Sequence, residues 1–222
     1  HPSGHIAAMT AQLPYATLQK IFQTFQAANA APEGELHHTN AYTLLVAVAL
    51  SAQATDVGVN KATKALFALA DTPQKMLALG EAALMEHIKT IGLFRNKAKN
   101  VIRLSQMLIE DYDGQVPSSR AALERLPGVG RKTANVVLGN AFGINEGVVV
   151  DTHVQRLTRR LGLTREADPI GIEKALMPLF PREDWALLSH LLIWHGRRRC
   201  FARKPDCTAC VVCEICPSGE TL

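Results

Sequence analysis

The chain has 222 residues, of which 47% are apolar and 20% are charged. This length suits one large domain or two small ones, and the apolar content excludes a disordered chain, collagen and a disulfide-rich miniprotein. The longest apolar stretch, residues 41–54, is interrupted by polar side chains and is shorter than the roughly 20 residues of a membrane span. We therefore expect a soluble, cytoplasmic protein with no membrane partner and no secretion signal, in which residues 1–8 are a candidate cloning remnant.

The net charge of +4 conceals an uneven distribution. Three segments, 89–103, 120–132 and 197–204, hold 14 of the 24 Lys and Arg residues and a single acid, Glu124. These segments carry a net charge of +13, and the rest of the chain carries −9. One such cluster is as readily a solvated surface as a binding site, but three of them in an otherwise acidic chain favour a polyanionic partner, most simply nucleic acid.

Apolar residues recur at helical spacing along the chain without sustained alternation, so the predicted fold class is all-α. Residues 72–73 and 168–169 each place an N-cap side chain before a proline, which marks two helix starts. We expect Gly196 to end the last helix, and residues 148–150 to form a buried extended segment. In chain order, the pattern predicts helices over residues 18–25, 42–52 and 56–69, from Pro73, over 81–91, 96–112, 118–125, 131–142 and 152–162, from Pro169, and over 183–195.

Two of these helices, over about 118–142, are joined by a turn that contains Gly128, Val129 and Gly130. The glycines permit a tight turn and a close backbone approach to a ligand, and Val129 would pack inward. The N–H groups that begin the next helix would then face a phosphate at the positive end of the helix dipole. With Arg131 following, the segment has the form of a helix-hairpin-helix motif, which binds DNA without reading its sequence. A purely structural helical hairpin is the alternative.

Lys132 lies in the first turn of that second helix. A helical lysine is usually only a solvated charge, but the dipole at this end of the helix favours the neutral amine that a lysine nucleophile needs. Asp151 opens the helix over 152–162, where it could act as an N-cap or steady a developing positive charge.

All five cysteines fall within 17 residues of the C-terminal tail. Thiols gathered in this way indicate a metal centre rather than disulfides that close long loops. Five thiols exceed the four ligands of one site. They are Cys200, Cys207, Cys210, Cys213 and Cys216.

The combination of motifs resembles the endonuclease III family of DNA glycosylases. The matching segments are 50–56, 90–93, 126–134 and 150–153, followed by the Cys-x6-Cys-x2-Cys-x5-Cys spacing in the tail, and together they run from about residue 40 to residue 216. The resemblance implies a bifunctional DNA glycosylase and AP lyase of base excision repair, which removes oxidised pyrimidines from duplex DNA containing a damaged base or an abasic site. It also implies a monomer.

By the same resemblance, Lys132 is the nucleophile and Asp151 its acidic partner. Gln53 and Leu93 occupy the positions that fill the gap left by the flipped nucleotide. By composition alone, Gln53 would be a polar residue at a helix end and Leu93 a core residue.

The family spacing assigns Cys200, Cys207, Cys210 and Cys216 to a 4Fe-4S cluster and leaves Cys213 as a spare packed thiol. The last four cysteines also form a ferredoxin-like C-x2-C-x2-C-x2-C run, and zinc held by four thiolates is a further alternative. We expect Arg203 and Lys204, in the loop after the first cysteine, to grip DNA phosphates.

The implied architecture has two helical lobes with a DNA-binding cleft. One lobe spans 34–144 and includes the hairpin motif; the other combines 1–33 with 145–222 and carries the iron-sulfur loop.

Three other functions compete with this interpretation. An adenine-specific mismatch glycosylase would lack the nucleophilic lysine and would need an acid in the helix over 42–52, where this chain has none. A non-catalytic DNA-binding module would leave the Lys132 and Asp151 pair unexplained. An electron carrier would need neither the hairpin nor the basic clusters.

Overall fold

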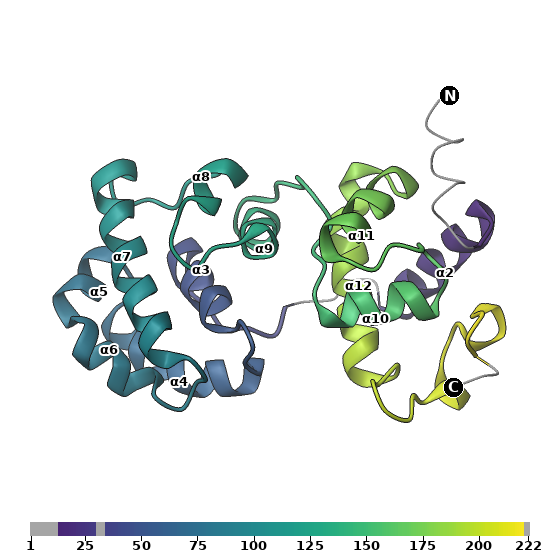
Figure 1. The fold of residues 1–222 in the computed structure, drawn as a ribbon, viewed down its shortest axis with the longest axis horizontal. Coiled ribbons are helices and arrows are strands. Elements are labelled where there is room, and N and C mark those ends of the chain that lie inside the picture. The colour runs from purple at the N-terminus through teal and green to yellow at the C-terminus, as the bar shows by residue number, and fades with distance from the viewer. Residues whose placement is uncertain (1–12, 30–33, 220–222) are drawn as a thin grey trace. The chain divides into compact units, whose positions relative to one another are not determined.

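The computed structural model describes residues 13–29 and 34–219, and this part of the chain contains helices and no β-strand (Figure 1). The all-α prediction is therefore confirmed. Residues 1–8, the candidate cloning remnant, lie outside the described residues. No helix in the described ranges has the length and apolar character needed to cross a membrane.

The chain divides into two compact units, each with its own hydrophobic core. The continuous unit is Glu35–Glu146. The discontinuous unit joins the described residues up to Gly34 to those from Gly147 onward.

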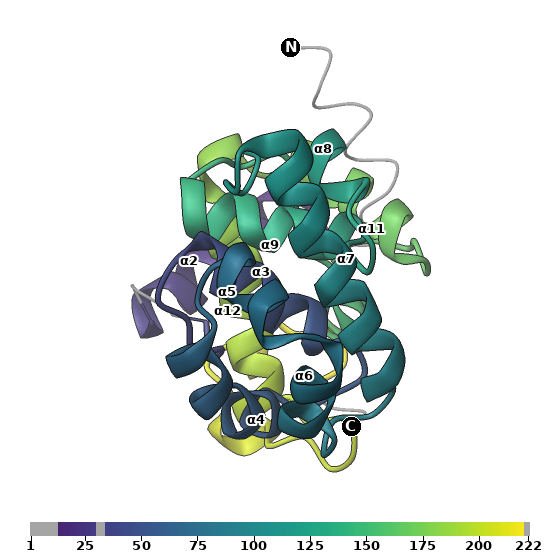
Figure 2. The ribbon, with the colours of Figure 1, turned by 90° about the vertical axis from the view of Figure 1, so that its left-hand side faces the viewer.

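The continuous unit is built around a buried helix, α3, whose residues are all buried except the first. This helix packs against α4, α7 and α9, and Figure 1 shows it between the last two. Figure 2 shows α4 and α6 side by side in the same unit. Its helices are α3 (Ala41–Leu50), α4 (Asp56–Leu69), α5 (Pro73–Leu79), α6 (Glu81–Ile88), α7 (Phe94–Tyr112), α8 (Arg120–Glu124) and α9 (Arg131–Phe142).

Side-chain caps set where several of these helices begin. The Asn40 side chain accepts a hydrogen bond from Thr43 N at 2.8 Å, and the Thr43 hydroxyl accepts one from Asn40 N at 3.0 Å, which makes a capping box at α3. Thr55 caps α4 with a single hydrogen bond, which its hydroxyl accepts from Gly58 N at 3.1 Å. Thr72 caps α5 with Pro73 at the first helical position, as predicted.

The discontinuous unit packs α12 against α10 and α2. Residues 148–150 lie ahead of α10 outside any helix and are buried, which agrees with the predicted burial. The unit's helices are α2 (Tyr15–Ala28), α10 (Thr152–Arg160), α11 (Pro169–Leu176) and α12 (Trp185–Arg198), with short 3-10 helices at Met177–Leu179, Arg182–Asp184, Cys207–Ala209 and Cys213–Ile215.

The prediction that Gly196 ends the last helix was wrong, because α12 continues to Arg198. A Cβ at Gly196 would lie 3.0 Å from the Cβ of His153 and 3.1 Å from Leu157 on α10. Glycine is therefore used here to bring two helices into close contact rather than to stop one.

Candidate functional site

The turn between α8 and α9 has the geometry that its two glycines suggest. Gly128 has φ +77°, in the left-handed region, and a Cβ there would lie 3.2 Å from the side-chain amide of Asn100. Val129 is buried with 6% of its surface exposed, so it packs inward as predicted. Gly130 is extended, and a Cβ there would meet no atom within 4 Å. The backbone at the start of α9 is thus open to a ligand.

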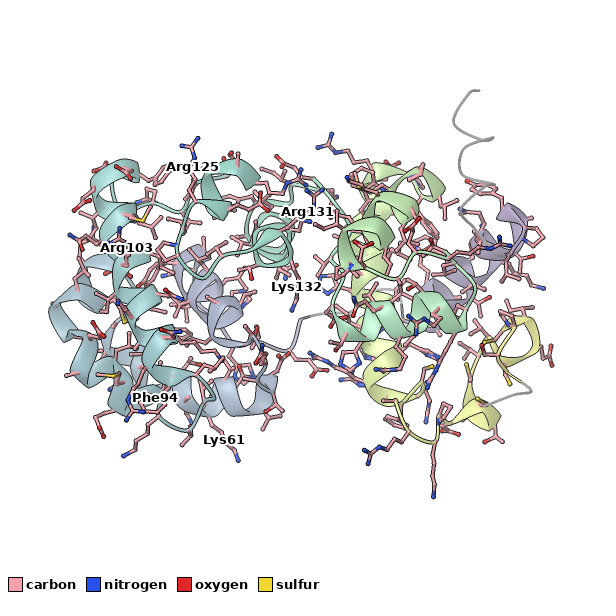
Figure 3. The ribbon with its side chains drawn as sticks, in the orientation of Figure 1. Lys61, Phe94, Arg103, Arg125, Arg131 and Lys132 are labelled. Atoms are coloured by element: carbon pink, nitrogen blue, oxygen red, sulfur yellow. The ribbon has the colours of Figure 1, made fainter. Side chains whose placement is uncertain are left out.

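Arg131 and Lys132 occupy the first two helical positions of α9, and Figure 3 shows their side chains leaving the helix in different directions. Lys132 is exposed, whereas Arg131 is half-buried. No side chain caps this helix, because its N-cap residue is Gly130. An amine, a guanidinium and uncapped N–H groups are therefore concentrated at one helix start, which is a favourable place for a phosphate.

Two turns of the continuous unit place Gln53 and Leu93 at its surface. Gln53 follows α3 with φ +55°, and Leu93 precedes α7 with φ +61°, so both are non-glycine residues in the left-handed region. Leu93 is 61% exposed, and Gln53 is also exposed. A large apolar side chain held out in solvent on a strained turn is typical of a binding residue rather than of a core leucine.

One residue of the first basic cluster does not contribute to the surface. Lys97 is only 8% exposed, and its Nζ donates a hydrogen bond to Ala52 O at 2.7 Å. Burial lowers the pKa of this amine. Lys97 therefore adds little to the surface charge of its cluster, because it lies on the buried face of α7.

Asp151 is the N-cap of α10, and its Oδ1 accepts a hydrogen bond from Val154 N at 2.8 Å. The carboxylate thus fills the structural role expected from the sequence. The residue as a whole is half-buried. Asp151 belongs to the discontinuous unit and Lys132 to the continuous one.

The five thiols line one cavity of the discontinuous unit. They share its wall with Arg160, whose Nη1 donates to Cys200 Sγ at 3.3 Å, and with His195, whose Nε2 lies 3.4 Å from Cys210 Sγ. Burial and the nearby Arg199 lower the pKa of His195 to about 4, so the ring is neutral near pH 7. Cys213 lines the cavity as well, so its presence there does not separate it from the other four.

Burial is also the main cause that raises the pKa of the Cys207, Cys210 and Cys216 thiols, and neighbouring cysteines raise it further. Within residues 13–29 and 34–219, no three His, Cys, Asp or Glu side chains are arranged to share a single metal ion. The thiols instead surround a common space.

The loop after Cys200 is held from α10 by Arg160, which donates to Phe201 O at 2.7 Å and to Ala202 O at 3.0 Å. Arg203 and Lys204 follow the two carbonyls that Arg160 binds, and both are exposed. The loop is therefore anchored at its base while its cationic tip faces solvent.

The sequence interpretation did not identify the arginines of α10 that hold this tail. Arg156 donates from Nε and Nη2 to Cys200 O, at 3.1 and 2.9 Å, and Arg160 binds the next two carbonyls. Their spacing of four residues shows that they share one helix face, but the sequence does not show what that face contacts.

Residues 46–182 match the model of the HhH-GPD superfamily of base excision DNA repair proteins. This chain belongs to that superfamily. It is also 52% identical over 196 residues to endonuclease III of Treponema pallidum, covering 88% of this chain and 92% of the relative.

Two solved structures have a TM-score of 0.89 and 42% sequence identity to this chain, and each comparison covers 94% of it. One is a non-covalent endonuclease III–DNA complex, 97% covered, and the other is a trapped covalent endonuclease III–DNA intermediate, 98% covered. The predicted DNA glycosylase with AP lyase activity in base excision repair is thereby confirmed.

Proposed function

We propose that this protein excises oxidised pyrimidines from duplex DNA with Lys132 as the nucleophile and Asp151 as the group that stabilises positive charge on the sugar. The observation that carries the proposal is the start of α9. There an exposed lysine amine follows directly on an uncapped, open turn that can hold a phosphate. The same few residues would thus supply the amine and bind the DNA backbone.

The reaction begins with the neutral Lys132 amine, whose lone pair forms a bond to C1′ of the damaged nucleotide. The bond between C1′ and the base breaks, and its electron pair leaves with the base, which takes up a proton. Loss of a proton from the nitrogen and opening of the C1′–O4′ bond then give a protonated Schiff base, with a hydroxyl at C4′. Asp151 would stabilise the positive charge that develops on the sugar during this step.

The iminium withdraws electrons and makes a C2′ proton acidic. Removal of this C2′ proton leads to the C2′=C3′ double bond and expels the 3′ phosphate. The DNA strand is thereby cut. Water then hydrolyses the Schiff base and frees Lys132. Because Lys132 and Asp151 come from different units, the proposal requires both units to bind the same nucleotide.

Several residues would hold the DNA during this reaction. Gly128, Val129, Gly130 and Arg131 would bind one phosphate region through the hairpin, while Arg203 and Lys204 would bind another through the anchored loop. Gln53 and Leu93, both displayed on left-handed turns, would fill the gap in the duplex.

The cysteine cavity fits a 4Fe-4S cluster held by Cys200, Cys207, Cys210 and Cys216. Several thiols surround a common space in which each iron would take one thiolate, and Arg160 directs a donor at Cys200 Sγ, which suits an anionic cluster. When bound, the cluster supplies a redox-capable centre that cross-links the tail. The chain's own contribution is to hold the loop after Cys200 against α10.

Trapping with borohydride tests the nucleophile. A Lys132→Ala variant should bind damaged duplex with near-normal affinity but release no base and give no covalent complex, because no other amine lies in that position. Lys132→Gln should behave in the same way. Lys64→Ala, which removes an exposed lysine of α4, is the matched control. A normal yield of trapped complex from Lys132→Ala would overturn the assignment.

A further inference from the structure

Gln53 and Leu93 belong to different turns, yet both adopt backbone conformations that side-chain-bearing residues avoid. The turn with Gln53 joins α3 to α4, and the turn with Leu93 joins α6 to α7. Strained residues of this kind persist only where the surrounding structure holds them. Contacts elsewhere in the unit must therefore hold the two turns in place. These contacts matter for function as well, because the role proposed for Gln53 and Leu93 depends on where their side chains point.

Lys97 bonds to both turns. Its backbone N–H donates to Leu93 O at 3.0 Å, which forms the first turn of α7. Its Nζ donates to Ala52 O at 2.7 Å, and that carbonyl belongs to the peptide group that immediately precedes Gln53. One residue thus connects Leu93 itself to the peptide bond of Gln53.

Lys97 is a costly choice for a merely structural residue. The side chain is buried, and its hydrogen-bond acceptor is a neutral carbonyl, which compensates a buried ammonium less well than a carboxylate would. An apolar side chain of similar size would fill the same space without that desolvation cost. A lysine at this position is therefore better explained by the hydrogen bond that it directs to Ala52 O than by a gain in stability.

We propose that Lys97 is a positioning residue that sets the spacing and direction of Gln53 and Leu93 as the pair that enters the duplex when the damaged nucleotide leaves the stack. This rests on the function proposed above for those two residues. Lys97 itself is buried and does not contact DNA. It acts by fixing one turn relative to the other.

The test uses a duplex that contains a tetrahydrofuran abasic analogue, which cannot react with Lys132, opposite the fluorescent base 2-aminopurine. Insertion of side chains beside that base changes its stacking and its fluorescence. For Lys97→Met, we expect the preference for this duplex over intact duplex to fall about tenfold, on the scale of one hydrogen bond from a charged donor. The fluorescence change should shrink, while affinity for intact duplex stays unchanged.

Lys64→Met is the matched control, because it makes the same substitution at an exposed lysine of the same unit. It should leave both measurements unchanged. Lys97→Arg, which retains a charged donor, should restore part of the preference. If Lys97→Met does not fold, Lys97→Gln, which retains an uncharged N–H donor, is measured in the same way and should lose less of the preference than the tenfold expected for Met.

A combined variant distinguishes positioning from general damage to the fold. In a Gln53→Ala, Leu93→Ala background, adding Lys97→Met should cause little further loss of preference, because the residues that it positions are already absent. A full additional loss, or an equal loss of affinity for intact duplex, would overturn the proposal. If Gln53→Ala and Leu93→Ala themselves leave the preference unchanged, the role proposed for those two residues fails, independently of the Lys132 trapping result.

Discussion

The helices that carry Lys132 and Asp151 both begin from extended backbone, but their N-termini are completed differently. At α10 the Asp151 carboxylate accepts the hydrogen bond of Val154 N, so the protein supplies its own anion. At α9 the N-cap is Gly130, which has no side chain to accept a hydrogen bond, and the space around the glycine is open. The capped helix is complete without a ligand, whereas the uncapped one is suited to bind an external phosphate.

The largest expected effect comes from disrupting the cysteine tail, which contacts α10 but belongs to a different unit from α9. Arg156 and Arg160 tie α10 to the carbonyls that follow from Cys200, whereas α9 belongs to the other unit. Cys210→Ser should therefore remove the yellow-brown colour and most of the soluble protein. A cluster left with three thiolates would be exposed to solvent and would no longer hold the tail in place. In what remains soluble, hydrogen exchange should show lost protection in α10 and retained protection in α9.

Cys213→Ser is the control for this experiment and should keep the visible absorption of an iron-sulfur protein. Bleaching by Cys213→Ser, together with normal colour in Cys216→Ser, would show that the ferredoxin-like set of ligands is the correct one. A colourless wild-type protein that contains zinc would remove the cluster from the proposal altogether.

The second prediction separates the two roles of Asp151. Asp151→Asn keeps a side-chain acceptor for Val154 N but removes the charge, so excision should slow by about 100-fold or more while thermal stability is unchanged. Asp151→Ala should be equally slow and also less stable, by about 1 kcal/mol, because the cap is lost. Single-turnover excision and thermal unfolding measure the two effects. Full activity of Asp151→Asn would show that Asp151 only caps α10 and that its charge is not needed for excision.

The third and smallest effect comes from giving α9 the kind of cap that α10 has. The extended backbone and open surroundings of Gly130 accommodate a side chain, so Gly130→Asp should fold. Its carboxylate would occupy the place of a DNA phosphate. Affinity for damaged and intact duplex should fall about tenfold, and the salt dependence should become shallower by roughly one unit.

Gly130→Asn and Gly130→Ala complete that series, since the first adds a neutral cap and the second adds neither cap nor charge. Affinity measured by fluorescence anisotropy should decrease in the order Ala, Asn, Asp. An aspartate variant that binds as tightly as the wild-type protein would show that no phosphate lies at the start of α9.

Most helices could be predicted from the sequence because their signals are local. The pattern over 56–69 and over 131–142 matches α4 and α9 at both ends, and the Thr72-Pro73 pair marks the start of α5. The end of α12 could not be predicted, because Gly196 is also the residue type that stops a helix. Only the contact with His153 and Leu157 shows why it continues.

The candidate site divides in the same way. A glycine turn before a basic helix and five cysteines in one tail are patterns of neighbouring residues, so the sequence by itself determined the hairpin, the nucleophile candidate and the position of the cysteine loop. The tertiary structure decided that Lys97 points inward to Ala52, that Leu93 stands exposed, and that Arg160 holds the loop after Cys200. These properties join residues about 40 apart in the chain or depend on which helix face is covered. Only packing determines which side chains are buried and which backbone carbonyls they meet.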